Sequence, residues 1–119
     1  SYNNMGNVYS DMGDYSQALV SYKASLDIQK KVLPPNHPDL ASSYNNMGNV
    51  FVRMGDYTQA LTSFKASLDI RQKVLPPNHP DLASSYGSMG NLYSDMGDYS
   101  QALTSYKASL DIQKKVLPP

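Results

Sequence analysis

Apolar side chains recur every three to four residues along most of this chain, and glycines or paired prolines interrupt them at regular places. Residues 80–96 carry Tyr86, Met89 and Tyr93 at helical spacing and are followed by Gly97. Apolar residues at i, i+3, i+4 and i+7 share one face of an α-helix, and glycine favours the left-handed conformation that closes a helix. The pattern therefore predicts a helix that ends at this glycine.

A second helix is predicted directly after that turn. Asp98 and Gln101 form a pair like a capping box, in which the carboxylate accepts hydrogen bonds from early backbone N–H groups. In the first copy of the pattern, helical spacing continues over residues 15–33, until Pro34-Pro35 removes the backbone donors that a helix needs. Each unit is therefore predicted to be a hairpin of two helices.

The hairpin pattern occurs three times with a period of 42 residues, and the first two copies differ at eight of 42 positions. A fixed period in this range is typical of stacked units, each of which buries its apolar face only against a neighbour. The sequence therefore predicts an all-α solenoid, and we expect one continuous stack cut from a longer array. Its repeats are residues 1–42, 43–84 and, truncated, 85–119.

Glycines and methionines within the repeats are predicted to serve the packing. Gly6, Gly48 and Gly90 lie inside helices, where glycine costs roughly 1 kcal/mol relative to alanine, so we expect another helix to approach closely there. All six methionines recur at helical spacing, which favours a role as core filler. They are Met5, Met12, Met47, Met54, Met89 and Met96.

Together these residues resemble the tetratricopeptide repeat. In the first copy the matching positions are Tyr2, then Met5-Gly6 three and four residues on, and then Tyr9, Ala18 and Tyr22. The copies exceed the usual length of about 34 residues because no proline ends the second helix near Lys30. This form is similar to the 42-residue repeats of kinesin light chains. The resemblance implies a right-handed superhelix whose first helices line a concave face that holds peptide or protein cargo.

The candidate binding face is a polar stripe on the first helix of each repeat. Its members recur at i, i+4 and i+8, so they share one side of the helix. In the resembled family such positions contact ligand, and an asparagine amide can both donate to and accept from an extended peptide backbone. The predicted contact residues are Asn3, Asn7, Asp11, Asn45, Asn49, Val52, Arg53, Asn91 and Asp95.

The asparagines of this stripe have two open interpretations. Asparagine is a poor helix former, so its presence at Asn7, Asn49 and Asn91 asks for a reason. One reason is hydrogen bonding from repeat to repeat along the stack, and the other is ligand binding. Arg53 would be the most distinctive contact for a partner, because the other two repeats carry aspartate at that position.

Composition excludes several classes of function. Ten basic residues balance ten acidic ones, so no bulk charge attracts nucleic acid or anionic lipid. No apolar stretch reaches the ~18 residues that span a membrane. Cysteine is absent, which excludes zinc–thiolate sites and is compatible with a reducing compartment such as the cytoplasm. His37 and His79 lie in turns, where we expect a histidine or an asparagine such as Asn36 to cap the following helix, and we expect no metal site there.

No catalytic motif occurs, whether a nucleophile elbow, a phosphate-binding loop or a zinc-protease signature. We therefore expect no enzyme and no cofactor, and predict a scaffold that binds a protein or an extended peptide. One alternative is end-to-end self-association through apolar faces at the two ends of the stack. The other is that the array forms the sensor arm of a larger signalling protein.

Overall fold

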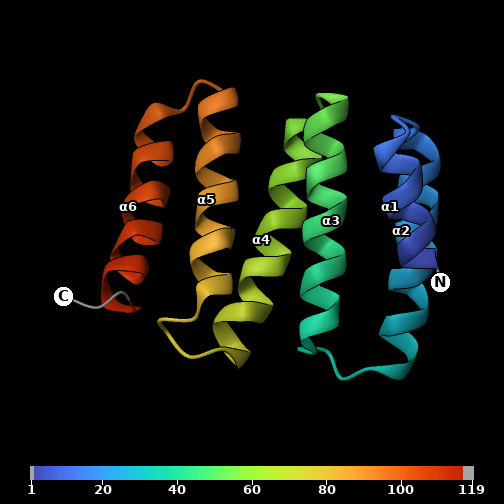
Figure 1. The fold of residues 1–119 in the computed structure, drawn as a ribbon, viewed down its shortest axis with the longest axis horizontal. Coiled ribbons are helices and arrows are strands. Elements are labelled where there is room, and N and C mark those ends of the chain that lie inside the picture. The colour runs from blue at the N-terminus through green and yellow to red at the C-terminus, as the bar shows by residue number, and fades with distance from the viewer. Residues whose placement is uncertain (1, 117–119) are drawn as a thin grey trace.

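The computed structural model describes residues 2–116, and these form six α-helices joined by short turns. The helices stand side by side along the longest axis, which measures 42 Å against 33 Å and 22 Å (Figure 1). Successive helices pack against one another both within a hairpin and between hairpins. The predicted all-α solenoid of three hairpins is confirmed. The helices are α1 (Tyr2–Asp11), α2 (Tyr15–Val32), α3 (Pro38–Met54), α4 (Tyr57–Val74), α5 (Pro80–Asp95) and α6 (Tyr99–Val116).

The turn inside each hairpin has the predicted structure. Gly13, Gly55 and Gly97 adopt φ angles of 81°, 79° and 82°, in the left-handed region that favours glycine. Directly after Gly13, Asp14 accepts a hydrogen bond at Oδ1 from the backbone N–H of Gln17, over 3.3 Å. The equivalent aspartates of the other hairpins make the same bond. These caps begin the second helix of each hairpin.

The turn between hairpins is capped by histidine, one of the two capping residues that the sequence allows. His37 accepts at Nδ1 from the backbone N–H of Asp39 over 3.1 Å, and Pro38 occupies the first position of α3. A proline is tolerated there because its missing N–H would have no helical partner. His79 repeats the bond at 3.0 Å before α5. These histidines thus accept through Nδ1, which a neutral imidazole can do.

The glycines inside the first helices lie against an aromatic ring of the second helix. A Cβ atom added to Gly48 would lie 2.6 Å from Cε1 of Phe64. A Cβ atom added to Gly6 would lie at the same distance from Cε1 of Tyr22. Gly90 has the same relation to Tyr106. The predicted close approach of the two helices is confirmed.

The prediction that every methionine fills the core is wrong for four of the six. Met47 and Met89 are buried in the middle of α3 and α5. The others are 42% to 71% exposed, for two reasons. Met5, within α1, has no helix before it to pack against. The other three lie at or just after the end of a first helix, beyond the reach of its neighbours. These exposed residues are Met5, Met12, Met54 and Met96.

The first junction between hairpins includes polar contacts of α2 with α3. Ser43 is fully buried and donates from its hydroxyl to Oε1 of Gln29 over 2.6 Å. The ammonium of Lys30 lies 5.8 Å from the centre of the Tyr44 ring.

The second junction uses the same positions with different side chains. Arg71 donates from Nη1 to the hydroxyl of Ser85 over 2.7 Å. Gln72 donates to the Tyr86 hydroxyl over 2.9 Å. The two junctions therefore share a geometry that tolerates a change of chemistry at two adjacent positions of the second helix.

Candidate binding groove

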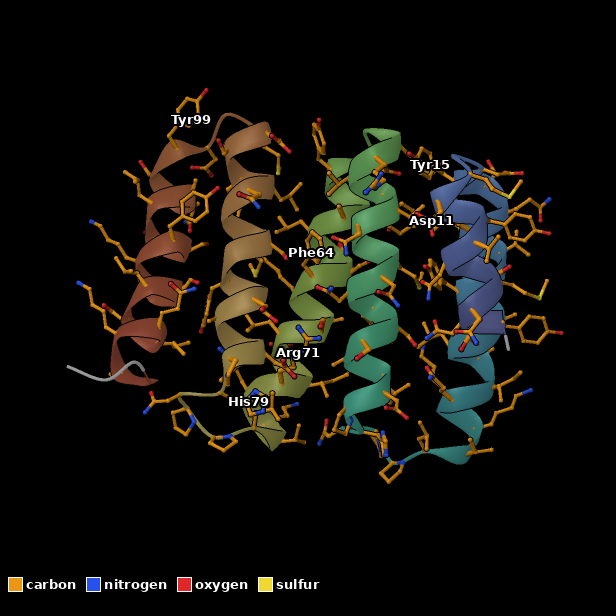
Figure 2. The ribbon with its side chains drawn as sticks, viewed as in Figure 1. Asp11, Tyr15, Phe64, Arg71, His79 and Tyr99 are labelled. Atoms are coloured by element: carbon orange, nitrogen blue, oxygen red, sulfur yellow. The ribbon has the colours of Figure 1, made fainter. Side chains whose placement is uncertain are left out.

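A groove of about 670 Å³ lies between the first two hairpins, with α1 on one side and α3 on the other. Figure 2 shows Asp11 in the space between these two helices. We call this cavity the α1–α3 groove. Its lining residues are Asn7, Ser10 and Asp11 of α1, Tyr22 of α2, and Asn46, Asn49, Val50, Val52 and Arg53 of α3.

Five of the nine predicted contact residues line this groove: Asn7, Asp11, Asn49, Val52 and Arg53. Helical spacing places them on the facing sides of two adjacent first helices, which is why the structure brings them together. The other four do not line it. Asn3 and Asn45 are half-buried nearer the beginnings of α1 and α3, and Asn91 and Asp95 are exposed on α5. The role of the stripe in binding stays a prediction.

Four lining residues were not among the predicted contacts: Ser10, Tyr22, Asn46 and Val50. Asn46 lies three residues before Asn49 and seven before Arg53, so the spacing that identified the stripe could also have found it. Tyr22 comes from α2, the second helix of the hairpin. No pattern in the first helix indicates that contribution.

Two of the three mid-helix asparagines accept a hydrogen bond from a tyrosine of their own hairpin. The Tyr22 hydroxyl donates to Oδ1 of Asn7, and the Tyr106 hydroxyl donates to Oδ1 of Asn91. The middle hairpin carries Phe64 at the tyrosine position, so it lacks this donor. Asn7 and Asn91 are therefore fixed within their hairpins, a role that neither interpretation of the stripe included.

The phenol of Tyr22 remains protonated well into the alkaline range. Burial raises its pKa above the ordinary value of 10.0, and the nearby Asp11 carboxylate raises the pKa further because it disfavours a second negative charge. A phenol that keeps its proton can continue to donate to Asn7.

The groove carries one acidic and one basic side chain that are not paired with each other. Asp11 and Arg53 are both exposed. Within residues 2–116, the only basic side-chain nitrogens within 4.0 Å of a carboxylate oxygen are the Nδ1 atoms of the two capping histidines, beside Asp39 and Asp81. The charges of Asp11 and Arg53 are therefore available to a partner.

Across residues 2–116, no three His, Asp or Glu side chains gather closely enough to hold a metal ion. None of the described helices combines the length and the apolar character needed to cross a bilayer.

Comparison with known proteins identifies the fold of the chain. A family model described as tetratricopeptide repeat matches residues 1–73 and 40–115. No curated protein matches the sequence.

Several solved structures have the same arrangement of helices. BtubC (BKLC) from P. vanneervenii superposes with a TM-score of 0.90 at 22% identity, over 99% of this chain and 48% of that one. A putative kinesin light chain from Podosopora anserina, with nearly identical TPR-like repeats, gives 0.86 at 21% identity, over 98% of this chain and 56% of that one. The N-terminal domain of stress-induced protein-1 from C. elegans gives 0.74 at 17% identity, over 93% and 80%. This chain thus spans about half the length of the first two structures.

Proposed function

Because the chain belongs to the tetratricopeptide repeat family, we propose that it is a non-catalytic scaffold that holds an extended peptide or protein segment in the α1–α3 groove. The observation that carries the proposal is the groove itself, whose walls bring together five of the residues that the sequence pattern selects for binding. Its volume of about 670 Å³ lies within the range of 300–1,000 Å³ that is usual for ligand sites.

The chemistry of the lining suits a peptide backbone. Asn49 is exposed and can donate and accept at the same time, since Phe64 offers its amide no hydrogen bond. Asn7 has its oxygen engaged by Tyr22, so its amide nitrogen is the group left to donate. The side chain of Val52 adds an apolar contact between these polar groups. The alternating carbonyl and N–H groups of a peptide main chain can form hydrogen bonds with these donors and acceptors.

The experiment is a binding screen with a library of acetylated, amidated decapeptides, read by fluorescence polarisation. Replacing Asn49 by alanine removes a donor and an acceptor, and two hydrogen bonds at about 1 kcal/mol each correspond to a loss of affinity of roughly thirtyfold. The control is Asn36→Ala, which changes an exposed asparagine in a turn outside the groove. The proposal fails if library peptides do not bind, or if they bind both variants and the parent chain equally well.

A second function, end-to-end self-association, is favoured by the faces at the two ends of the stack. Val8 is 57% exposed at the outer side of α1, whereas Val50, at the same position of the middle hairpin, is 1% exposed. Leu110 is 47% exposed at the outer side of α6, whereas its equivalent Leu26 is 6% exposed. The junctions inside the chain therefore bury the same positions that its two end faces expose.

In this alternative, one copy of the 119-residue chain docks its α6 side on the α1 side of the next. Such a contact joins two different surfaces and does not close on itself, so it would produce filaments. Sedimentation velocity over a wide concentration range is the test, with Val8→Lys as the variant that blocks one face. A chain that remains monomeric at high concentration would rule the alternative out.

A further inference from the structure

Three charged residues occupy one equivalent position in the three first helices. Asp11, Arg53 and Asp95 are separated by the repeat length, and all three are exposed. We call them the charge row. Asp11 is the last residue of α1, Asp95 is the last residue of α5, and Arg53 lies in the last turn of α3. The row therefore follows one edge of the stack with alternating negative, positive and negative charge.

The two aspartates are not placed to stabilise their own helices. The C-terminal end of a helix is the negative end of its dipole, so a cation there is favourable and an anion is unfavourable. Arg53 satisfies this rule, but Asp11 and Asp95 oppose it. No cation of residues 2–116 lies within 4.0 Å of either carboxylate to compensate. Packing within the chain thus gives no reason for the charge of these two residues.

The α1–α3 groove presents two members of the row to the same ligand. Asp11 comes from the α1 wall and Arg53 from the α3 wall. The two walls differ in their other polar groups as well, because Tyr22 engages the oxygen of Asn7 whereas Asn49 has no tyrosine opposite it. A peptide that crosses the groove would therefore meet an acidic wall with a donor amide, and then a basic wall whose amide can donate and accept.

We propose that the groove, together with Asp95 outside it on α5, selects a peptide with an acidic side chain that binds Arg53 and basic side chains on either side of it, one for Asp11 and one for Asp95. This inference rests on the proposed function and names the charge pattern of its partner. Directly packed helices lie on the order of 10 Å apart, and an extended chain advances about 3.3 Å per residue. The first helices of successive hairpins have a groove between them, so the charges of the peptide should be at least about three residues apart. Because the pattern is symmetric, it does not fix the direction of the peptide.

The test uses three acetylated, amidated peptides of equal length that differ only in their charged positions. The matched peptide is Lys-X-X-Glu-X-X-Lys, the reversed peptide is Glu-X-X-Lys-X-X-Glu, and the neutral peptide has glutamine at all three positions. We expect the matched peptide to bind at least tenfold more tightly than the reversed one at low salt. The difference should shrink as salt increases, because the contacts are exposed to solvent.

Two variants of the chain separate a local contact from a change of net charge. Arg53→Asp turns the row into three negative charges, so it should abolish the preference for glutamate at the central position of the peptide. Lys65→Asp makes the same change of charge at an exposed position of α4 outside the groove and should preserve that preference. Circular dichroism of both variants verifies that each remains helical.

The outcomes distinguish this inference from the function on which it rests. If the three peptides bind equally well, or if Arg53→Asp and Lys65→Asp behave alike, the charge pattern is wrong while the groove remains a peptide site. The inference is also wrong if decapeptides from the library bind but none of the three designed peptides does. If neither the library nor the designed peptides bind, the proposed function and the inference fall together.

Discussion

Adding one methyl group to Gly48 should destabilise the middle hairpin, although alanine is the better helix former. The new Cβ would lie 2.6 Å from Cε1 and 2.7 Å from Cδ1 of Phe64. The ring is only 3% exposed and is enclosed by the core, so it has little room to move away. Gly87 is the matched control on α5, because the nearest atom to its added Cβ, the Ser109 hydroxyl oxygen, is 4.0 Å away.

The two substitutions should have opposite signs. Alanine adds about 1 kcal/mol of helix propensity at either site. Overpacking a core costs about 1–3 kcal/mol, and the short contacts at Gly48 favour the upper half of that range. The net effect is a loss of about 1–2 kcal/mol for Gly48→Ala and a gain of up to about 1 kcal/mol for Gly87→Ala. At roughly 4 °C per kcal/mol, the midpoints of the two variants should differ by about 4–12 °C.

The assay is thermal and urea unfolding followed by circular dichroism at 222 nm. A double variant, Gly48→Ala with Phe64→Leu, tests the cause, because shrinking the ring should remove most of the penalty for the methyl group and give a non-additive cycle. Equal stabilisation by Gly48→Ala and Gly87→Ala would refute the reasoning, since it would mean that the ring does not confine the glycine.

Three further changes test the caps, the tyrosine bond and the hairpin junction by the same unfolding measurements. Asp56→Ala removes the N-cap of α4 and should cost about 1 kcal/mol, while Asp56→Asn should retain most of the stability. Tyr22→Phe should cost about 1 kcal/mol by leaving Asn7 without its donor. The pKa of Tyr22 is higher in the folded chain than in the unfolded one, so the protonated phenol stabilises the fold fully below about pH 10. This contribution is lost as pH rises through the pKa of the folded chain. The free energy of unfolding of the parent chain should therefore fall more steeply at alkaline pH than that of Tyr22→Phe. Arg71→Ala should cost about 1 kcal/mol at the junction with Ser85, whereas Arg71→Gln should cost less because glutamine makes the equivalent bond at the first junction.

Local sequence signals were sufficient to predict the helices and their ends. Gly97 marks the end of a first helix because the required left-handed conformation is a property of that single residue. Asp98 marks the next helix because its cap bonds to the backbone only three residues away. Period and spacing then identified the hairpin and the stack. All of these depend on residues that are close together in the chain.

Features that depend on two helices at once were predicted less well. Periodicity shows which side of a helix is apolar but not whether another helix reaches that side, which is why Met12 was wrongly placed in the core. The bond from Tyr22 to Asn7 depends on the rotation of α2 relative to α1, and neither residue indicates it alone. The groove was only partly predicted for the same reason, since its width depends on the distance between successive hairpins.

The pairing of each helix with its neighbours in the chain, seen at both junctions, also determines how the stack should open. The substantial contacts run between successive helices, so no long-range closure of the chain is needed and folding should be fast. A hairpin at either end packs against one neighbouring hairpin only, whereas the middle hairpin of α3 and α4 packs against a hairpin on each side. Amide hydrogens should therefore exchange fastest in the outer helices α1 and α6 and slowest in the middle hairpin, so the protection of the backbone would decline from the centre of the stack toward both ends.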